Sequence, residues 1–308
     1  MDDLLLQKCI TFMDKKEALR QKYFFSNLDE NAVIAYIYMY HKQEINFDAL
    51  SSCEWIVKKA FSFTSPYRQA HPRIYAAMMA VSQQDPDTVV ARVMAFEQQF
   101  NRSFAKNNGL AVLAFIAAEI QPVEYQPIYY TALSIYNRMK DLHRFLTNDQ
   151  DVIYAGILAM TPHLKEDVVD ELVIMDDLLM NEYHLDGDYA RRLSYVLALC
   201  EGTATVKVRR AMELIQAITN GWDRSINYLY FILPAVLANI SISFERVLED
   251  YEEVSAFLKM QKDYGKFYNH TRSLHTCMIL LQYYAEDNLS IYAVINAIVF
   301  SITNAQRS

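Results

Sequence analysis

Leu110-Ala111-Val112-Leu113-Ala114-Phe115-Ile116-Ala117 is an unbroken apolar octet, long enough for two turns of a buried helix. Similar octets begin at residues 32, 74, 153, 193, 229 and 274, so that successive starts lie 36 to 45 residues apart. An apolar helix repeated at this period is typical of stacked helical hairpins, each of which buries its apolar face against its neighbours. The other octets are Ala32–Met39, Ile74–Val81, Ile153–Met160, Leu193–Cys200, Leu229–Val236 and Leu274–Leu281.

An amphipathic segment follows the octets and predicts the second helix of each hairpin. Val89, Val93, Phe96 and Phe100, for example, are spaced as one face of a helix. Such stripes begin 15 residues after the octet starts at 74, 153, 193 and 229, and 18 residues after the start at 110. The chain is therefore predicted to be all-α, a right-handed array of about seven helical hairpins. These hairpins can form an open α-solenoid or close into an α/α toroid, and the sequence does not decide between the two.

We expect the array to form one domain over residues 1–308. Residues 1–60 form a less regular N-terminal cap, residues 61–288 form the regular hairpins, and residues 289–308 form a C-terminal capping helix. No linker that would divide the chain is visible in the sequence.

Polar residues and glycines are expected to mark the helix ends. Asp85, before Pro86, and Ser243 are suited to cap the starts of second helices. Gly109, Gly187, Gly221 and Gly265 follow second helices, where a left-handed residue is wanted at the C-terminal end.

The composition excludes several classes of protein. The chain is 53% hydrophobic with a net charge of −8, so it can form a core, and its acidic surface argues against nucleic-acid binding. The four cysteines are far apart in sequence, which favours free thiols in a reducing compartment. The acidic start lacks the pattern of a secretory signal, and the apolar stretches are too short or too interrupted to span a membrane. We expect a cytoplasmic protein without a membrane span, and nothing in the sequence decides its oligomeric state.

No catalytic constellation is complete in the sequence. The histidines lack the Glu-x-x-His and His-Glu-x-x-His spacings of metal sites, and nucleophile and phosphate-loop motifs are missing. We therefore predict no catalytic residue, no metal and no cofactor.

The most suggestive polar residues lie in the connectors that lead from a second helix to the next octet. In a solenoid such connectors line up along one edge, where their side chains could bind a ligand or partner. The same residue types also cap helix starts without any further role, and both interpretations stay open. The candidate residues are Tyr67, Arg68, Thr147, Asp149, Asp151, Asp188, Arg191, Asp223, Arg224 and Arg272.

Tyrosine is abundant, with 22 copies, many of them beside the octets. Tyrosine combines contact area with a hydrogen-bonding group, which suits a concave face that binds protein, and it equally suits packing between repeats. The tyrosines concerned are Tyr36, Tyr38, Tyr40, Tyr129, Tyr130, Tyr283 and Tyr284.

Two connectors carry a resemblance to a known family. Phe63-Thr64-Ser65-Pro66-Tyr67-Arg68 and Phe145-Leu146-Thr147-Asn148-Asp149-Gln150-Asp151 are similar to segments of a bacterial, Firmicutes-type family catalogued as domain of unknown function four thousand and three. The resemblance extends from about residue 20 to the tail, although Gln69 stands where members often have glycine. It implies the helical fold and a bacterial cytoplasmic setting, and it implies no activity.

The function that these observations favour is a non-catalytic interaction or regulatory module that binds a protein or peptide. One alternative is an α/α-toroid enzyme acting on a carbohydrate or an isoprenoid. Another is a small-molecule sensor that uses Arg68, Asp151 and Arg191.

Overall fold

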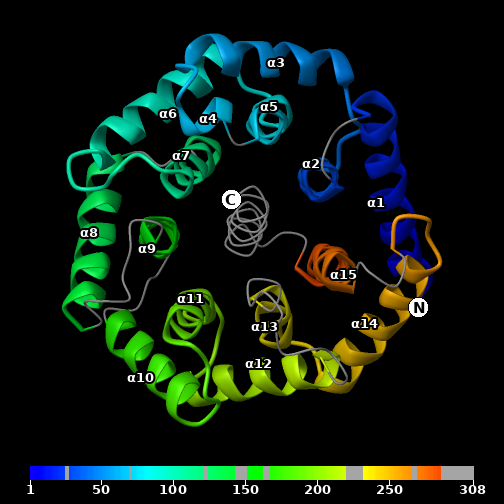
Figure 1. Ribbon diagram of the computed structural model, residues 1–308, viewed down its shortest axis with the longest axis vertical. Helices are drawn as coiled ribbons and strands as arrows, with labels where there is room; N and C mark the ends of the chain where they lie inside the picture. The colour runs from blue at the N-terminus through cyan, green and yellow to red at the C-terminus, as the bar shows by residue number, and fades with distance from the viewer. Residues whose placement is uncertain are drawn as a thin grey trace. The chain divides into compact units, whose positions relative to one another are not determined.

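The computed structural model describes residues 1–24, 28–69, 71–120, 124–142, 151–161, 167–219, 232–264 and 269–285. Within these ranges the regular structure consists of fifteen α-helices and no strand (Figure 1). The prediction of an all-α chain is confirmed, and the helices form an array. No helix in the described part of the chain is long and apolar enough to cross a membrane.

The contacts divide the described chain into two compact units. Residues 15–161 form the N-terminal unit, and residues 1–14 together with 167–285 form the C-terminal unit. Helix α1 (Asp3–Lys22) supplies residues to both. The prediction of one domain over residues 1–308 stays a prediction, and the predicted capping helix at 289–308 lies outside the described residues.

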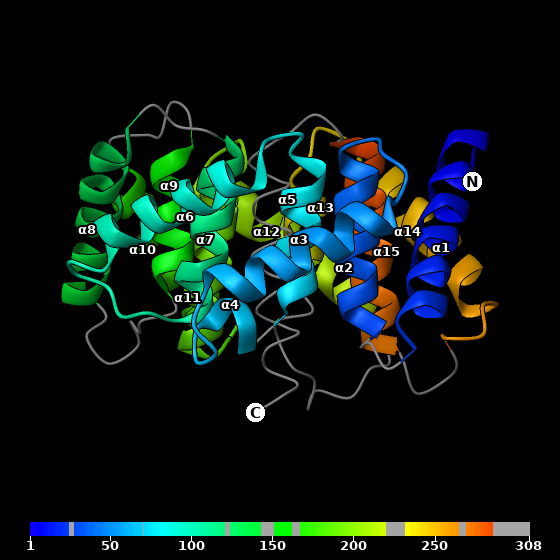
Figure 2. The same cartoon turned by 90° about the horizontal axis from the view of Figure 1, so that it is seen from above.

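In the N-terminal unit two kinds of helix alternate. The octets lie in α2 (Leu28–Tyr40), α5 (Pro72–Val81), α7 (Asn108–Ile120) and α9 (Val152–Met160), which we call octet helices. Each octet helix packs beside the next, and Figures 1 and 2 show α5, α7 and α9 side by side. The amphipathic segments form α3 (Phe47–Ala60), α6 (Pro86–Phe100) and α8 (Tyr125–Leu142), the stripe helices, and α4 (Pro66–Gln69) is a single short turn.

The C-terminal unit repeats this arrangement. Its octet helices α11 (Gly187–Leu197), α13 (Ile232–Ala238) and α15 (Asn269–Tyr284) pack in succession. Its stripe helices are α10 (Val168–Asn181), α12 (Ala204–Thr219) and α14 (Phe244–Lys259), which also contact one another in order.

The most extensive packing joins each stripe helix to the octet helix that follows it. Helix α6 packs far more closely on α7 than on α5, and α12 packs far more closely on α13 than on α11. The alternation of octet and stripe helices matches the prediction. The predicted hairpin joined an octet helix to the stripe helix after it, whereas the closest packing is between a stripe helix and the octet helix of the next hairpin. The connectors with the candidate residues therefore join the most closely packed helices.

The octets of α2 and α7 are apolar throughout because they are buried on every side. All residues from Ala32 to Met39 and from Leu110 to Ala118 are buried, whereas a helix at a surface keeps a polar face. Tyr36 and Tyr38 are among these buried residues, so they pack inside the fold and do not form a binding face.

The bounds of one octet differ from the bounds of the helix that contains it. The octet at 193–200 suggests a helix through Cys200, but α11 begins at Gly187 and ends at Leu197. The side chain of Asp186 starts the helix early, because it accepts a hydrogen bond from the amide of Asp188 at 3.0 Å.

The predicted caps at two stripe helices are confirmed. Asp85 accepts a hydrogen bond from the amide of Thr88 at 3.0 Å, and Ser243 accepts one from the amide of Arg246 at 3.3 Å.

The prediction for the glycines is wrong at Gly109 and Gly187, and Gly221 and Gly265 lie outside the described residues. Gly109 and Gly187 lie at the starts of α7 and α11, where helical backbone needs no left-handed residue. The left-handed positions after α2, α5 and α10 are occupied by Lys42, Gln83 and His184. Chain reversal at these points is achieved without glycine, at some cost in backbone strain.

Candidate functional site

Tyr67 lies in the core of the N-terminal unit, below the short turn α4. Its ring stacks on Phe61 with centroids 4.0 Å apart and meets Tyr75 and Phe115 at 5.4 and 5.7 Å. Burial, together with the negative charge of Glu97, raises the pKa of the Tyr67 phenol well above its ordinary value. Tyr67 therefore anchors the turn, and the Glu97 carboxylate of α6 lies close enough for its charge to act on the Tyr67 phenol.

Arg68 lies at the surface of the same turn, half-buried. Its guanidinium sits over the ring of Phe63, 5.4 Å from the centroid, in a cation–π contact. The Phe63 side chain is 70% exposed, and its carbonyl accepts a hydrogen bond from the Gln69 amide at 2.6 Å. The connector thus presents an aromatic ring and a cation together.

The remaining described candidates have structural roles at helix starts. Arg191 is fully buried and pairs with Asp188, one turn earlier on α11, at 2.9 Å. Arg272 donates to Ser255 on α14 at 3.2 Å and to Asn269 at 2.9 Å, which ties the start of α15 to its stripe helix. Asp151 is buried at the N-cap of α9.

The structure brings together only some of the predicted residues. Asp188 meets Arg191, and Tyr67 adjoins Arg68, whereas Arg68 and Asp151 belong to one unit and Arg191 to the other. Thr147, Asp149, Asp223 and Arg224 lie outside the described residues.

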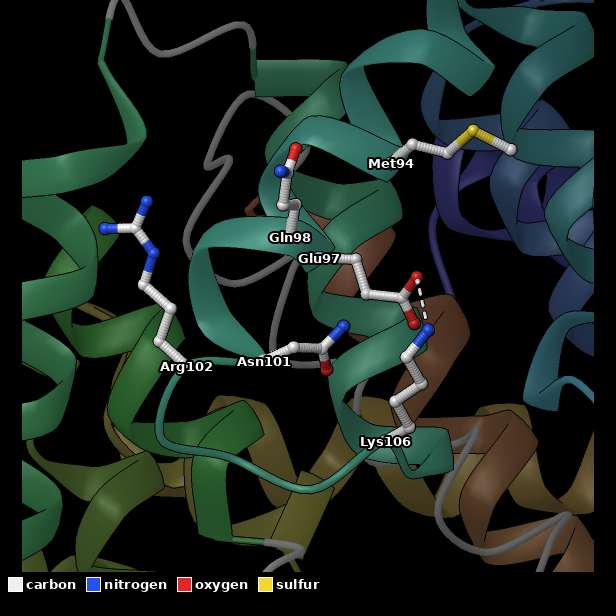
Figure 3. Close-up of a pocket in the computed structure, with 6 residues that line it drawn as sticks. All are labelled: Met94, Glu97, Gln98, Asn101, Arg102 and Lys106. Atoms are coloured by element: carbon white, nitrogen blue, oxygen red, sulfur yellow. Dashed lines mark ion pairs between the residues drawn. The ribbon is translucent and has the colours of Figure 1, made fainter.

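A pocket of about 350 Å³ lies on the stripe helix α6 and the connector to α7 (Figure 3). The carboxylate of Glu97 and the amine of Lys106 point toward one another across it, 3.7 Å apart. Arg102 and Met94 point away from this pair in opposite directions. The lining residues are Met94, Glu97, Gln98, Asn101, Arg102 and Lys106.

The pocket faces the α4 side of α6. Phe96 and Phe100 pack on Tyr125 and Tyr129 of α8, and burial raises the pKa of the Tyr125 phenol while the nearby charge of Arg92 partly offsets that rise. Glu97, one position after Phe96, instead acts on Tyr67. Since successive helical residues are turned by about 100°, the flank carrying the pocket lies away from α8 and toward α4.

Trp55 adds a second exposed aromatic ring near this turn. It stands on the face of α3 opposite the buried residues Cys53 and Val57, and its side chain is 62% exposed. The amine of Lys59, one turn later, lies 4.8 Å from its ring centroid. We call Trp55, Lys59, Phe63, Arg68 and the pocket the α4 surface. Helix α4 contacts both α3 and α7, so this surface is built around one turn of chain.

Buried ion pairs elsewhere are accounted for by packing. In the N-terminal unit, Glu30 of α2 pairs with Arg73 of α5 at 3.1 Å. In the C-terminal unit, Glu171 of α10 pairs with Lys207 of α12 at 2.9 Å. Each pair joins neighbouring helices. Within the described ranges, histidines, cysteines and carboxylates do not gather into groups of three that could hold a metal ion.

The comparisons with known proteins identify a family. The sequence model of a family described as "Protein of unknown function (DUF4003)" matches residues 16–308. The chain belongs to this family. The match begins within α1 and includes the residues of the α4 surface. Neither a curated protein nor a solved structure matches this DUF4003 chain.

Sequence reasoning identified the α4 connector of this DUF4003 chain and missed the pocket beside it. Glu97, Asn101 and Lys106 lie in and after a stripe helix, where polar residues are expected on any exposed face. One signal was present. Residues 55–69 and 98–110 contain five basic residues and no acidic one, in a chain of net charge −8.

Proposed function

We propose that the protein is a non-catalytic interaction module that binds a protein or peptide partner on the α4 surface. The observation that carries this proposal is the pair of exposed aromatic rings, Trp55 and Phe63, each covered by a cation. Large exposed aromatic side chains are costly in water, and tryptophan and arginine dominate the binding energy of protein interfaces.

The contacts within the surface support a prearranged binding site. The cation–π contacts restrict Lys59 and Arg68 before any partner arrives, which lowers the entropy lost on binding. The adjoining pocket can receive one anchoring side chain of the partner, as binding hot spots commonly do.

The proposed location is the bacterial cytoplasm. The four cysteines are free thiols, and Cys9, Cys53 and Cys277 are buried, as expected in a reducing compartment. A regulatory role would follow if the partner's own activity changes on binding.

The proposal is tested by comparing variants in quantitative affinity capture from native cytosol. Trp55→Ser with Phe63→Ser removes both rings at exposed positions, so the fold should persist. Ile174→Ser on α10 is the matched control, because Ile174 is also an exposed apolar residue, 51% exposed, in the C-terminal unit.

We expect at least one protein to be enriched by the wild type and the Ile174→Ser control and lost with the double variant. If the captured proteins are the same for all three, the α4 surface is not the binding site. Circular dichroism of each variant verifies that helical content is unchanged.

A further inference from the structure

We infer that the α4 surface takes an acidic linear peptide segment of its partner, an inference that rests on the proposed function. The local charge is opposite to that of the chain. Lys59 and Arg68 lie over the two exposed rings, Arg102 and Lys106 line the pocket, and Glu97 is the acidic residue of the pocket. Lys58 pairs with Glu54 at 2.5 Å and Lys106 pairs with Glu97 at 3.7 Å, so each of these lysines already has an acidic neighbour, and the five basic residues still outnumber the two carboxylates.

The basic residues alternate with exposed rings, which defines the composition of the ligand. Carboxylates of the segment would pair with the arginine and lysine groups, and apolar side chains would cover Trp55 and Phe63. Charge complementarity of this kind steers association and selects partners, and exposed charges mainly set the rate and salt dependence of binding.

The pocket favours a peptide over a phosphate polymer. Asn101 has its Oδ1 atom buried there without a hydrogen-bond partner among the described residues, and Glu97 is mostly buried beside it. Both need hydrogen-bond donors, which a peptide backbone supplies through its amides. A nucleic-acid backbone offers phosphate oxygens instead, which only accept hydrogen bonds and would leave both groups without a donor.

A random 12-residue peptide display library, selected on the immobilised full-length chain, tests this inference. We expect the selected peptides to be enriched in aspartate and glutamate relative to the library. A selected peptide is then synthesised with a fluorescein label, and its affinity is measured by anisotropy. A second version with glutamine and asparagine in place of its acidic residues should bind at least about tenfold more weakly.

Charge reversal locates the binding on the protein. Arg68→Glu and Lys106→Glu should each weaken the acidic peptide at least about tenfold, and the weakening should shrink as salt is added. Arg209→Glu, an exposed reversal on α12 of the C-terminal unit, is the matched control and should leave affinity unchanged. Lys59→Glu is a further exposed variant, should Arg68→Glu disturb the fold.

The possible outcomes separate this inference from the proposed function. If the selected peptides need Trp55 and Phe63 for binding but are not enriched in acidic residues, the inference of an acidic ligand is wrong. The proposed function as an interaction module then still holds. Tighter binding of a labelled oligothymidine of 12 nucleotides, lost with Lys106→Glu, overturns the peptide in favour of nucleic acid. A selection without any peptide that depends on the two rings overturns the inference, and the capture experiment then decides the proposed function separately.

Discussion

Gly156 of α9 lies directly against Leu113 of α7. A β-carbon on Gly156 would come within 3.0 Å of the Leu113 Cγ atom and closer still to both of its methyl groups. Leu113 is fully buried, so it has little room to move. Helices α7 and α9 can approach closely because this position has no side chain.

Gly156→Ala is therefore expected to destabilise the protein although alanine is the better helix former. Overpacking of a buried contact costs about 1–3 kcal/mol, which exceeds the gain in helix propensity of about 1 kcal/mol. Urea unfolding measures the change. Adding Leu113→Val to Gly156→Ala should restore part of the loss, and a single variant as stable as the wild type would show that the helices separate without cost.

The Glu171–Lys207 ion pair predicts that a single variant is less stable than the double variant that replaces both residues. Lys207 is fully buried, and Lys207→Met would leave the Glu171 carboxylate without its cation in the core. Removing one partner of a buried pair costs about 3–5 kcal/mol, while replacing both by apolar residues is often nearly neutral. Lys207→Met with Glu171→Leu should thus be more stable than Lys207→Met alone in thermal unfolding. Equal or lower stability of the double variant would contradict this.

The helical array could be predicted from the sequence because a helix that is buried on all sides appears as an unbroken run of apolar residues. Where a helix is enclosed, as in Leu110–Ala118, every position must be apolar, and the octet marks the helix directly. The start of helix α11 could not be predicted in this way, because its first two turns contain Asp188, Arg191 and Arg192. Its start depends on the cap at Asp186, which apolar periodicity does not register.

The candidate site was less predictable for two physical reasons. Arg191 is a connector candidate in the sequence, yet it is fully buried, paired with Asp188 one turn earlier on the same helix. The pocket residues lie between 25 and 40 positions after the α4 turn, and only the fold of the chain brings Glu97 near Tyr67. The spacing of residues in the sequence predicts which side chains lie together on one helix. It does not predict which side chains of different repeats come into contact.

Alkaline conditions should weaken the fold. Burial raises the pKa of the Cys9 thiol to about 12 and that of the Tyr38 phenol to about 12, against ordinary values of about 8.5 and 10. Above pH of about 9 the unfolded chain releases these protons while the folded chain keeps them, so the free energy of unfolding falls as pH rises. Each group contributes up to about 1.4 kcal/mol per pH unit until its folded-state pKa is reached.

Urea unfolding at pH 8.0, about 9.5 and about 10.5 measures this slope. Cys9→Ala should flatten the decline because one of the titrating groups is removed, whatever its effect on stability at pH 8.0. A free energy of unfolding that stays constant across this range would contradict the buried, protonated state of these residues.

Two buried tyrosines should respond in opposite directions to the loss of their hydroxyl groups. The Tyr251 hydroxyl donates to the buried Ser273 at 2.7 Å, whereas the Tyr67 hydroxyl is buried without a hydrogen-bond partner in the described structure. An unsatisfied buried polar group costs about 1–3 kcal/mol, and a satisfied one contributes about 1 kcal/mol. Tyr67→Phe should therefore raise the free energy of unfolding by about 1 kcal/mol, and Tyr251→Phe should lower it by a similar amount.

Tyr67→Phe also separates the anchoring of the α4 turn from its surface chemistry. The phenylalanine ring keeps the stacking on Phe61, so Arg68 and Phe63 should stay in place and partner binding should be unchanged. Guanidinium unfolding of both variants measures the change in stability. The affinity of Tyr67→Phe for the peptide tests whether the surface is unchanged. A loss of stability with Tyr67→Phe would mean that its hydroxyl has a partner in solution, most simply a bound water.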